Sequence, residues 1–493
     1  MSLVPATALA LLVLAAAGCL PVLGLVGFRW FALPLIPLGG AVVAAVAATC
    51  GLGIGADTMT WFVIVAVLGA LSTLGFWWWR PDRRPWAPSL QAGSPAAASG
   101  AAGPGHRAIG IVGLLGVFGA SAWCLRTLAT PTIGFDTRAI WLLRAGWFLQ
   151  PHHQLLVDMS TPGVFLPQTA YPPLVSAVGS VAYAVTGNHA LRLGVVVIAL
   201  LNACALAAAA LAVVEAGRRA SGRLGPTRLA VIPSVVGLMA ALALVFVTFA
   251  ITEPFMTNGY ADPIWALSAV GAIAFGLQMG GDRSNIGAAA ILLVVAGMAK
   301  DEGAATAAIL IGLVALRRLM AVGRAGRRGW WKPVAAALLG WAFVGAWPAT
   351  IHLLHLRDAQ NGGGRRSQYL HRAHQTFTGT APYLHVVILA AAVAVAGWLV
   401  LIPLRRATGM GNDLWGWAGL ASGTAVLLAA YVTGTLNVPL WLTTTAHRVT
   451  EFTALSSWWL IALWAVTGSA GPACRWCRST TGPDTLQGAG STS

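Results

Sequence analysis

Apolar runs separated by short polar segments make up most of this chain of 493 residues. Many of the runs approach or exceed the roughly 20 residues with which an α-helix crosses the hydrocarbon core of a bilayer. The pattern therefore predicts an all-α polytopic membrane protein with about 13 transmembrane helices. We expect these helices near residues 3–27, 31–55, 58–79, 108–130, 189–216, 229–251, 263–281, 286–300, 303–316, 331–353, 383–404, 414–436 and 449–470.

Three of the apolar segments are short. The run 174–187 cannot span a membrane, and it predicts a helix that lies at the surface or is partly re-entrant. The runs 286–300 and 303–316 predict a helical hairpin. We expect its turn, Lys300-Asp301-Glu302-Gly303, to be buried in the outer half of the protein.

Composition supports the same class, because 57% of the residues are apolar and only 9% are charged, far fewer than the surface of a soluble protein needs. The net charge of +16 does not indicate nucleic-acid binding, since the arginines are scattered through short loops with no basic domain. The first apolar run has no basic residue before it, so we expect a retained helix and not a cleaved signal peptide.

The arginines predict the orientation, because cytoplasmic loops carry an excess of basic residues. With the segment 80–107 placed inside, the inside segments hold 20 basic and 5 acidic residues, and the outside segments hold 10 basic and 9 acidic residues. The loops 134–174 and 354–382 then face away from the cytoplasm. The other segments assigned to the inside include 217–228, 317–332, 405–413 and the tail, and the count also includes Arg29, Glu215, Asp282 and Arg283.

Composition also predicts the domain boundaries. A stretch rich in Pro, Ala, Gly and Ser indicates a disordered cytoplasmic linker between two membrane regions. The C-terminal tail contains Cys474 and Cys477, a pair that suits metal binding or electron transfer but is more often incidental in a disordered tail. The predicted units are an N-terminal three-helix unit (1–79), the linker (80–107), the main transmembrane module (108–470) and the cytoplasmic tail (471–493).

The first outer loop, 134–174, is the longest segment outside the apolar runs that mixes acids, bases, histidines and aromatics. Spacing places Asp136 and Arg144 near one face of a short helix, with Trp141 on an apolar flank. A carboxylate ahead of an amphipathic surface helix suits chemistry on a lipid-borne substrate. The alternative role for Asp136 is a helix N-cap, and for Trp141 simple packing.

The second outer loop is bracketed by Glu253 and Asp262. Acids at a membrane are expensive to place, so each is a functional candidate. Since both outer loops follow long helices to one surface, we expect Asp136 and Asp262 to share a cavity, with carboxylates within about 10 Å. The alternative for Asp262, which precedes Pro263, is again a helix N-cap.

Cations on the outer side form a second set of candidates. Arginine binds phosphate bidentately, although an outer loop can also hold arginines near anionic lipid. Arg448, expected at the start of the last helix, needs an anion, and the alternative partner is Glu451. In the turn at Lys300, either the lysine pairs with the neighbouring acids Asp301 and Glu302, or the turn binds a phosphate or a sugar. The loop 354–382 contributes Arg357, Arg365, Arg366 and Arg372.

No Walker, Rossmann, HExxH or serine-nucleophile motif is found, so ATP and nicotinamide have no visible site. The residue usage is typical of a GC-rich bacterium such as an actinobacterium. Five short motifs follow one another along the chain: Asp136 with Trp141 and Arg144-Ala145, Tyr171-Pro172-Pro173-Leu174, Gly259-Tyr260-Ala261-Asp262, Lys300-Asp301-Glu302-Gly303 and His447-Arg448. In this order they resemble motifs of the C-type superfamily of polytopic membrane glycosyltransferases, over roughly residues 108–470.

The resemblance implies a glycosyltransferase of the plasma membrane, with its active site on the periplasmic or extracellular side. It would move a sugar from a polyprenyl-phosphate donor to a glycan, lipid or protein acceptor of the cell envelope by inverting single displacement. Asp136 is then the general base, and Asp262 and Glu253 bind the acceptor or a divalent cation. The implied donor-phosphate residues are Arg448, Lys300, Arg365, Arg366 and Arg372, and the implied substrate-binding residues are Trp141, Arg144, Tyr171, Tyr260, Glu302 and His447.

The chain departs from the family pattern in two ways: it lacks a folded C-terminal outer domain, and it has a long loop at 354–382. The acceptor is therefore open. The alternative function is a membrane transporter or a flippase for lipid-linked sugars. That class predicts internal two-fold similarity and acids spread through the helices, whereas here the sequence shows no repeat and gathers its acids at one face.

Overall fold

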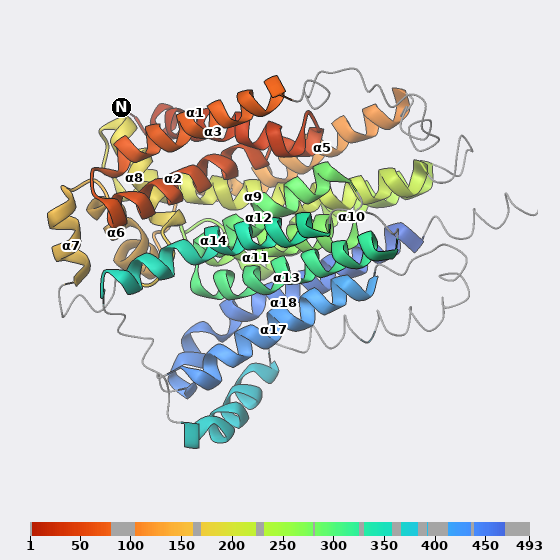
Figure 1. Cartoon of the computed structure of the whole chain (residues 1–493). Helices are drawn as coiled ribbons and strands as arrows, with labels where there is room; N and C mark the ends of the chain where they lie inside the picture. The colour runs from red at the N-terminus through yellow and green to blue at the C-terminus, as the bar shows by residue number, and fades with distance from the viewer. Residues whose placement is uncertain are drawn as a thin grey trace, which may run out of the picture.

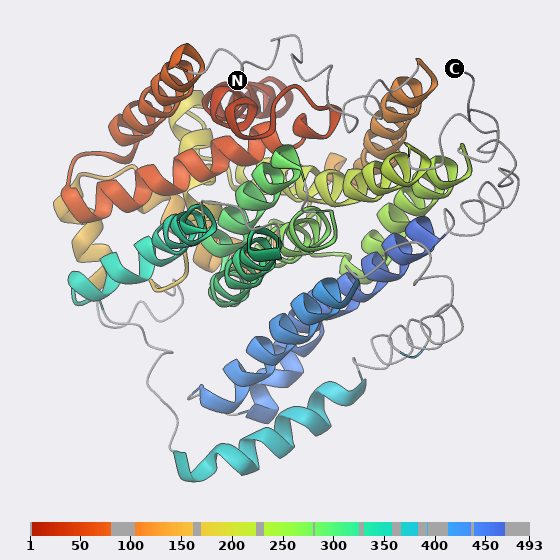
Figure 2. The same ribbon diagram turned by 45° about the vertical axis from the view of Figure 1, so that its right-hand side comes forward.

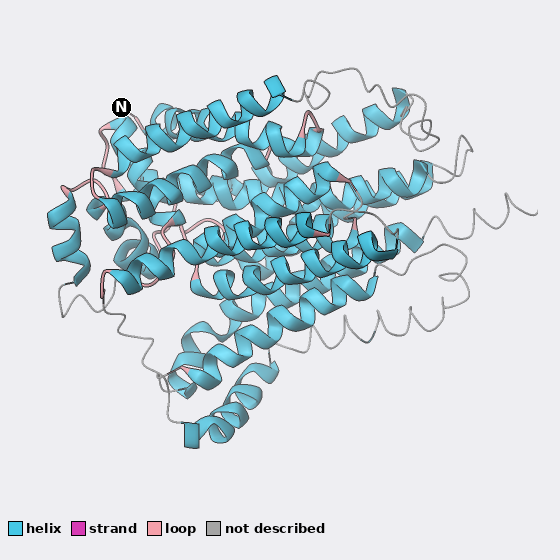
Figure 3. Ribbon diagram, viewed as in Figure 1, coloured by secondary structure: helices cyan, strands magenta, loops and turns pink. Residues whose placement is uncertain are grey.

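The protein is an all-helical bundle over the residues that the computed structural model describes, and these include no strand (Figure 1, Figure 3). Long helices run side by side along one direction, and the short helices α6, α7 and α8 gather at one end (Figure 1). The described residues are 2–79, 104–160, 169–222, 231–279, 282–324, 330–356, 366–382, 392, 413–434 and 438–468.

Nine helices within these ranges are long and apolar enough to cross a membrane. The prediction of a polytopic helical membrane protein is confirmed at this level. In chain order the nine are α1 (Leu3–Val26), α2 (Leu35–Ile54), α3 (Thr58–Trp79), α5 (Pro104–Cys124), α9 (Leu191–Gly222), α10 (Val231–Thr252), α13 (Asp301–Arg324), α14 (Trp331–Leu353) and α17 (Asp413–Thr433).

Further helices complete the bundle and cover one end of it. In the bundle lie α11 (Asp262–Ala272) with its π-helical continuation η6 (Ile273–Gln278), α12 (Arg283–Ala299) and α18 (Val438–Gly468). The shorter elements are η1 (Trp30–Ala32), η3 (Leu125–Ala129), the π-helical turn η4 (Thr137–Trp141), α6 (Leu142–Trp147), α7 (His152–Ser160), α8 (Leu174–Thr186), η7 (Arg366–Gln368) and a helix over 369–382.

Two predicted boundaries were wrong. The last helix begins at Val438 and not near residue 449, because its threonines are accommodated in the helix: Thr445 Oγ1 donates to the Trp441 carbonyl at 2.8 Å. The second arm of the predicted hairpin continues as α13 to Arg324. The predicted helix 383–404, the linker up to residue 103 and the tail with Cys474 and Cys477 lie outside the described residues.

The N-terminal helices α1 and α2 pack against helices of the main transmembrane module. Both α1 and α2 pack against α8, α9 and α12. Small residues let α1 and α2 approach closely, since a Cβ on Gly40 would stand 1.9 Å from the Leu14 carbonyl oxygen. At the other side of the bundle, α17 and α18 lie side by side (Figure 2).

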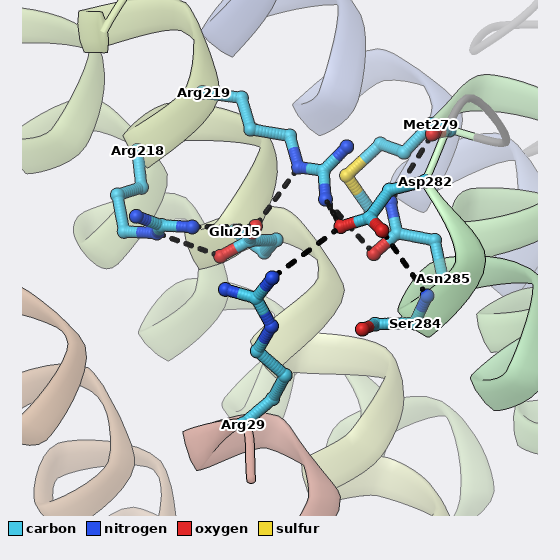
Figure 4. A network of polar contacts seen from close by, with 8 residues as sticks. All are labelled: Arg29, Glu215, Arg218, Arg219, Met279, Asp282, Ser284 and Asn285. Carbon is cyan, nitrogen blue, oxygen red and sulfur yellow. Dashed lines mark hydrogen bonds and ion pairs between the residues drawn. The ribbon is translucent and has the colours of Figure 1, made fainter. Parts of the chain in front are cut away.

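Charged residues that the predicted topology places inside form a network of ion pairs and hydrogen bonds (Figure 4). Glu215 is 1% exposed and accepts from Arg218 and Arg219. Arg219 also contacts Asp282 at 2.9 Å, and Arg29 reaches Asp282 at 3.8 Å. Because Asp282 precedes α12 and Lys300 follows it, the two residues mark opposite ends of the bundle.

Candidate functional site

Four charged side chains from distant parts of the chain form one ion-paired group: Asp136, Asp262, Lys300 and Arg448. We call it the outer cluster, after the side of the membrane on which the sequence predicts its loops to lie. Arg448 Nη2 lies 2.7 Å from Asp136 Oδ2 and 2.8 Å from Asp262 Oδ2. Lys300 Nζ lies 2.7 Å from Asp262 Oδ1. The two carboxylates therefore share one guanidinium, which agrees with the expectation that they face one site.

Neither aspartate caps a helix. Asp136 precedes η4 and Asp262 opens α11, but neither side chain makes a capping hydrogen bond. Asp262 is 1% exposed, and both of its oxygens are occupied by Lys300 and Arg448. Asp136 is 22% exposed and reaches the cluster through Arg448. Asp262 is thus the buried centre of the cluster, and Asp136 is the more accessible acid.

The two outer loops are joined directly to each other. The Gly134 amide donates to the Asn258 carbonyl at 3.1 Å, and Thr137 Oγ1 donates to the same oxygen at 2.8 Å. Gly259 has φ +86°, and a Cβ there would stand 2.5 Å from Thr137 Cγ2, so glycine is required on both grounds. These contacts fix Asp136 relative to Asp262.

Lys300 reaches the cluster because it breaks the chain between α12 and α13. Its backbone is extended, with φ −160° and ψ 159°, and its side chain is 4% exposed. The expectation of a buried turn is therefore confirmed at this residue. A Cβ on Gly303 would stand 2.1 Å from the Ala296 carbonyl oxygen, so the hairpin is tight. Lys300 also pairs with Glu302 at 3.3 Å.

Aromatic rings enclose the cations of the cluster. The Arg448 guanidinium lies 4.4 Å from the centre of the Tyr260 ring and 5.6 Å from that of Phe255. Lys300 Nζ lies 5.9 Å from the centre of the Tyr171 ring, which stacks on Trp141 at 5.3 Å. Such cation–π contacts favour a buried cation.

Trp141 and Arg144 support the site and do not line it. Trp141 is 1% exposed and Arg144 is fully buried, with its guanidinium 5.2 Å from the Trp347 ring centre. Arg144 Nη1 donates to the Tyr171 carbonyl at 2.8 Å, so it fixes the chain ahead of the two prolines. Burial lowers the pKa of Arg144 to about 9 and raises that of the Tyr171 phenol well above its usual value. In this structure both side chains are packed inside the protein, and substrate contact by Trp141 and Arg144 stays a prediction.

Other predicted residues are placed elsewhere. Glu253 is exposed, and in the described part of the chain no ion pair joins it to the outer cluster. Arg372 donates to the carbonyls of Tyr431 and Val432 at 2.8 and 3.0 Å, so it caps the end of α17 and is not placed to hold a phosphate. Arg357 and Arg365 lie outside the described residues, and the side chains of Arg366 and His447 are not described.

The alternative pairing of Arg448 with Glu451 is wrong. Arg448 lies eleven residues into α18, and both of its carboxylate partners come from other segments. Glu451 is 2% exposed, and neither of its oxygens has a hydrogen-bond partner. Sequence reasoning also missed Thr137 and Asn258; their only signal is that each lies within a few residues of a candidate aspartate.

The arrangement does not fit a divalent cation between the two aspartates. The Arg448 guanidinium occupies that position at hydrogen-bonding distance from both carboxylates. Within the described ranges, no group of three or more His, Cys, Asp or Glu side chains is placed to hold a metal ion. The guanidinium thus takes the place between the acids that a metal ion would otherwise fill.

Comparison with known proteins gives no family assignment: no protein-family model, curated protein or solved structure matches this chain significantly.

Proposed function

We propose that the protein is an integral-membrane glycosyltransferase that moves a sugar from a polyprenyl-phosphate donor to an acceptor of the cell envelope. The observation that supports this most is the outer cluster, in which an accessible carboxylate stands beside two buried cations. Glycosyl transfer from a phosphate donor needs those two elements: a base for the acceptor hydroxyl and cations for the leaving phosphate.

In this proposal the architecture is that of the C-type superfamily. The nine helices with the length and hydropathy of membrane spans are joined by α11 with η6, α12 and α18, and by the predicted helix 383–404 outside the described residues. That gives the 13 crossings expected from the sequence. The outer cluster then lies at the non-cytoplasmic side of the plasma membrane, opposite the arginine-rich end of α9.

Asp136 is the base because it is the more accessible of the two bridging carboxylates. It takes the proton of the acceptor hydroxyl while that oxygen bonds to the anomeric carbon of the sugar. The bond from the anomeric carbon to the phosphate oxygen breaks in the same step, so the configuration inverts and polyprenyl phosphate leaves. Lys300 and Arg448 stabilise the negative charge on the leaving phosphate.

The ion pair between Asp136 and Arg448 has a kinetic consequence. The carboxylate oxygen that accepts a hydrogen bond from Arg448 is not free to accept the proton of an acceptor hydroxyl. The donor phosphate is a better bidentate partner for Arg448 than a single carboxylate oxygen. Donor binding therefore draws Arg448 away from Asp136, and the base becomes available only when the donor is in place.

The role of Asp262 differs from the expectation. Its oxygens are already bound to Lys300 and Arg448, so it orients the two cations and does not bind an acceptor. Arg448→Ala should accordingly weaken donor binding and slow transfer together. Arg448→Lys should recover only part of both, because an ammonium group cannot contact two oxygens as a planar fork.

The test is sugar transfer by the purified protein in nanodiscs, from a panel of radiolabelled polyprenyl-phosphate sugars to envelope acceptors. Asp136→Asn is the loss-of-base variant. Asp158→Asn is the matched control, because Asp158 lies in α7, accepts a hydrogen bond from Gln154 and takes no part in the ion pairs of the outer cluster. Transfer by the control and not by Asp136→Asn supports the proposal. Flux of a lipid-linked sugar across the bilayer without transfer would favour the alternative, a transporter or flippase.

A further inference from the structure

Glu451 is a buried acid next to the outer cluster that the proposed reaction has not used. It lies three residues beyond Arg448 on α18, and side chains at this spacing are neighbours on one helix face. Its side chain is 2% exposed, and both carboxyl oxygens are without a hydrogen-bond partner. A buried polar group in this state calls for a functional explanation.

We propose that Glu451 is held as a neutral carboxylic acid and that its O–H donates a hydrogen bond to the phosphate of the donor. This role rests on the proposed function and adds a residue to its phosphate site. Burying an ionised carboxylate without partners is so unfavourable that such a group takes up a proton instead. In its neutral form Glu451 has one hydrogen to donate.

The charges around the cluster favour the neutral form. The two cations of the outer cluster, Lys300 and Arg448, are already paired with three carboxylates. These are Asp136 and Asp262 of the cluster, and Glu302 beside it. An ionised Glu451 would add a further negative charge where a phosphate has to bind. A neutral acid adds a donor without adding charge. The phosphate therefore gains a third contact beside its two cations.

The titratable groups around Glu451 come from the outer cluster and from the helices packed against α18. The charged groups that act on it are Asp262, Arg448 and Lys300. Both α10 and η6, which pack against α18, carry no titratable residue. Of the other elements packed against α18, α11 presents Asp262, α17 has Asp413 and Tyr431, and α9 has Arg192, Cys204, Glu215, Arg218 and Arg219; on α18 itself stand His447 and Arg448.

The experiment compares Glu451→Gln with Glu451→Ala, using polyprenyl phosphate, the leaving group, as the probe in nanodiscs. Glutamine keeps the size and a donor, so Glu451→Gln should bind the probe like the wild type at neutral pH. Alanine removes the donor, and binding should weaken about 10- to 100-fold. Wild-type binding should also weaken as rising pH removes the proton, and Glu451→Gln should lack that dependence.

An infrared spectrum gives a readout that does not need the ligand. The wild type should show the C=O stretch of a buried protonated carboxylic acid, and Glu451→Gln should lose it. Binding by Glu451→Gln as weak as that of Glu451→Ala, or wild-type binding by Glu451→Ala, would overturn the proposal. If the wild type binds no polyprenyl phosphate, the glycosyltransferase proposal fails, and the donor role of Glu451 fails with it. Asp158→Asn again serves as the acid-to-amide control.

Discussion

Replacing Asp136 with Asn should separate donor binding from catalysis. The amide has nearly the same size as the carboxyl group, and Asp136 makes no capping hydrogen bond, so the fold should survive the change. The substitution removes the proton acceptor and one of the two anionic partners of Arg448. Sugar transfer should therefore fall, whereas polyprenyl-phosphate binding should tighten.

General magnitudes and the exposure of Asp136 give the expected loss in transfer rate and the expected gain in donor affinity. Loss of a general base slows a reaction by roughly 10²- to 10⁴-fold. A hydrogen bond to a charged group contributes about 1.5–3 kcal/mol. Because Asp136 is 22% exposed, solvent screening reduces its pairing with Arg448 to about 1 kcal/mol. Releasing Arg448 should therefore tighten donor binding about fivefold.

The assay measures the two quantities independently in nanodiscs. Equilibrium binding of polyprenyl phosphate gives the affinity, and single-turnover transfer with saturating donor gives the rate of the chemical step. Asp158→Asn should leave both unchanged.

Two results would refute this reasoning. Weaker binding by Asp136→Asn would mean that Asp136 contacts the donor and does not compete with it for Arg448. An unchanged rate would mean that the base lies elsewhere, and since both oxygens of Asp262 are occupied, the carboxylate of Glu302 would be the next to test.

Three further predictions concern the buried ion pair, the contact between the two loops and the orientation in the membrane. In a double-mutant cycle of Asp262→Asn and Lys300→Met, the unfolding free energies should be non-additive by about 1–3 kcal/mol, and additivity within about 0.5 kcal/mol would show that the buried pair is not coupled. Gly134→Ala should reduce transfer roughly tenfold or more, because the added Cβ would stand 2.0 Å from the ring of Tyr260, which covers the Arg448 guanidinium, and would displace it. Transfer at the wild-type rate would show that the loops rearrange freely. Single cysteines in the loop 354–382 should react with an impermeant reagent in intact cells and those in the linker 80–107 should not, and the reverse pattern would overturn the orientation.

The sequence predicted the membrane class and most helices because apolar runs of spanning length have few other stable structures in lipid. It also paired the two aspartates, since alternation of the helices brings both loops to one surface. The start of α18 was missed because a run of three threonines before His447-Arg448 resembles a loop. In the structure those residues are helical, with Thr445 bonding back to Trp441.

The detailed chemistry of the site could not be predicted, because it depends on which side chains meet. Spacing along α18 makes Glu451 the nearest acid to Arg448, yet Arg448 turns to carboxylates from two other segments. The aromatic face of Trp141 suggested a sugar platform, but Tyr171 covers it. Arg372 was assigned to phosphate as one of several arginines concentrated in a predicted outer loop, whereas its partners are backbone carbonyls that no sequence pattern identifies.

Helix α12 determines how far apart the two charged ends of the protein lie. Its 17 residues span about 25 Å, less than the roughly 30 Å of a typical hydrocarbon core. Arg219 pairs with Asp282 at one end, and Asp262 pairs with Lys300 at the other, so α12 cannot slide along its axis without breaking an ion pair. The depth of the outer cluster is therefore a property of the protein and not of the lipid. In the proposed membrane arrangement, a bilayer thicker than this distance thins around the protein to reach the cluster, or covers it with acyl chains.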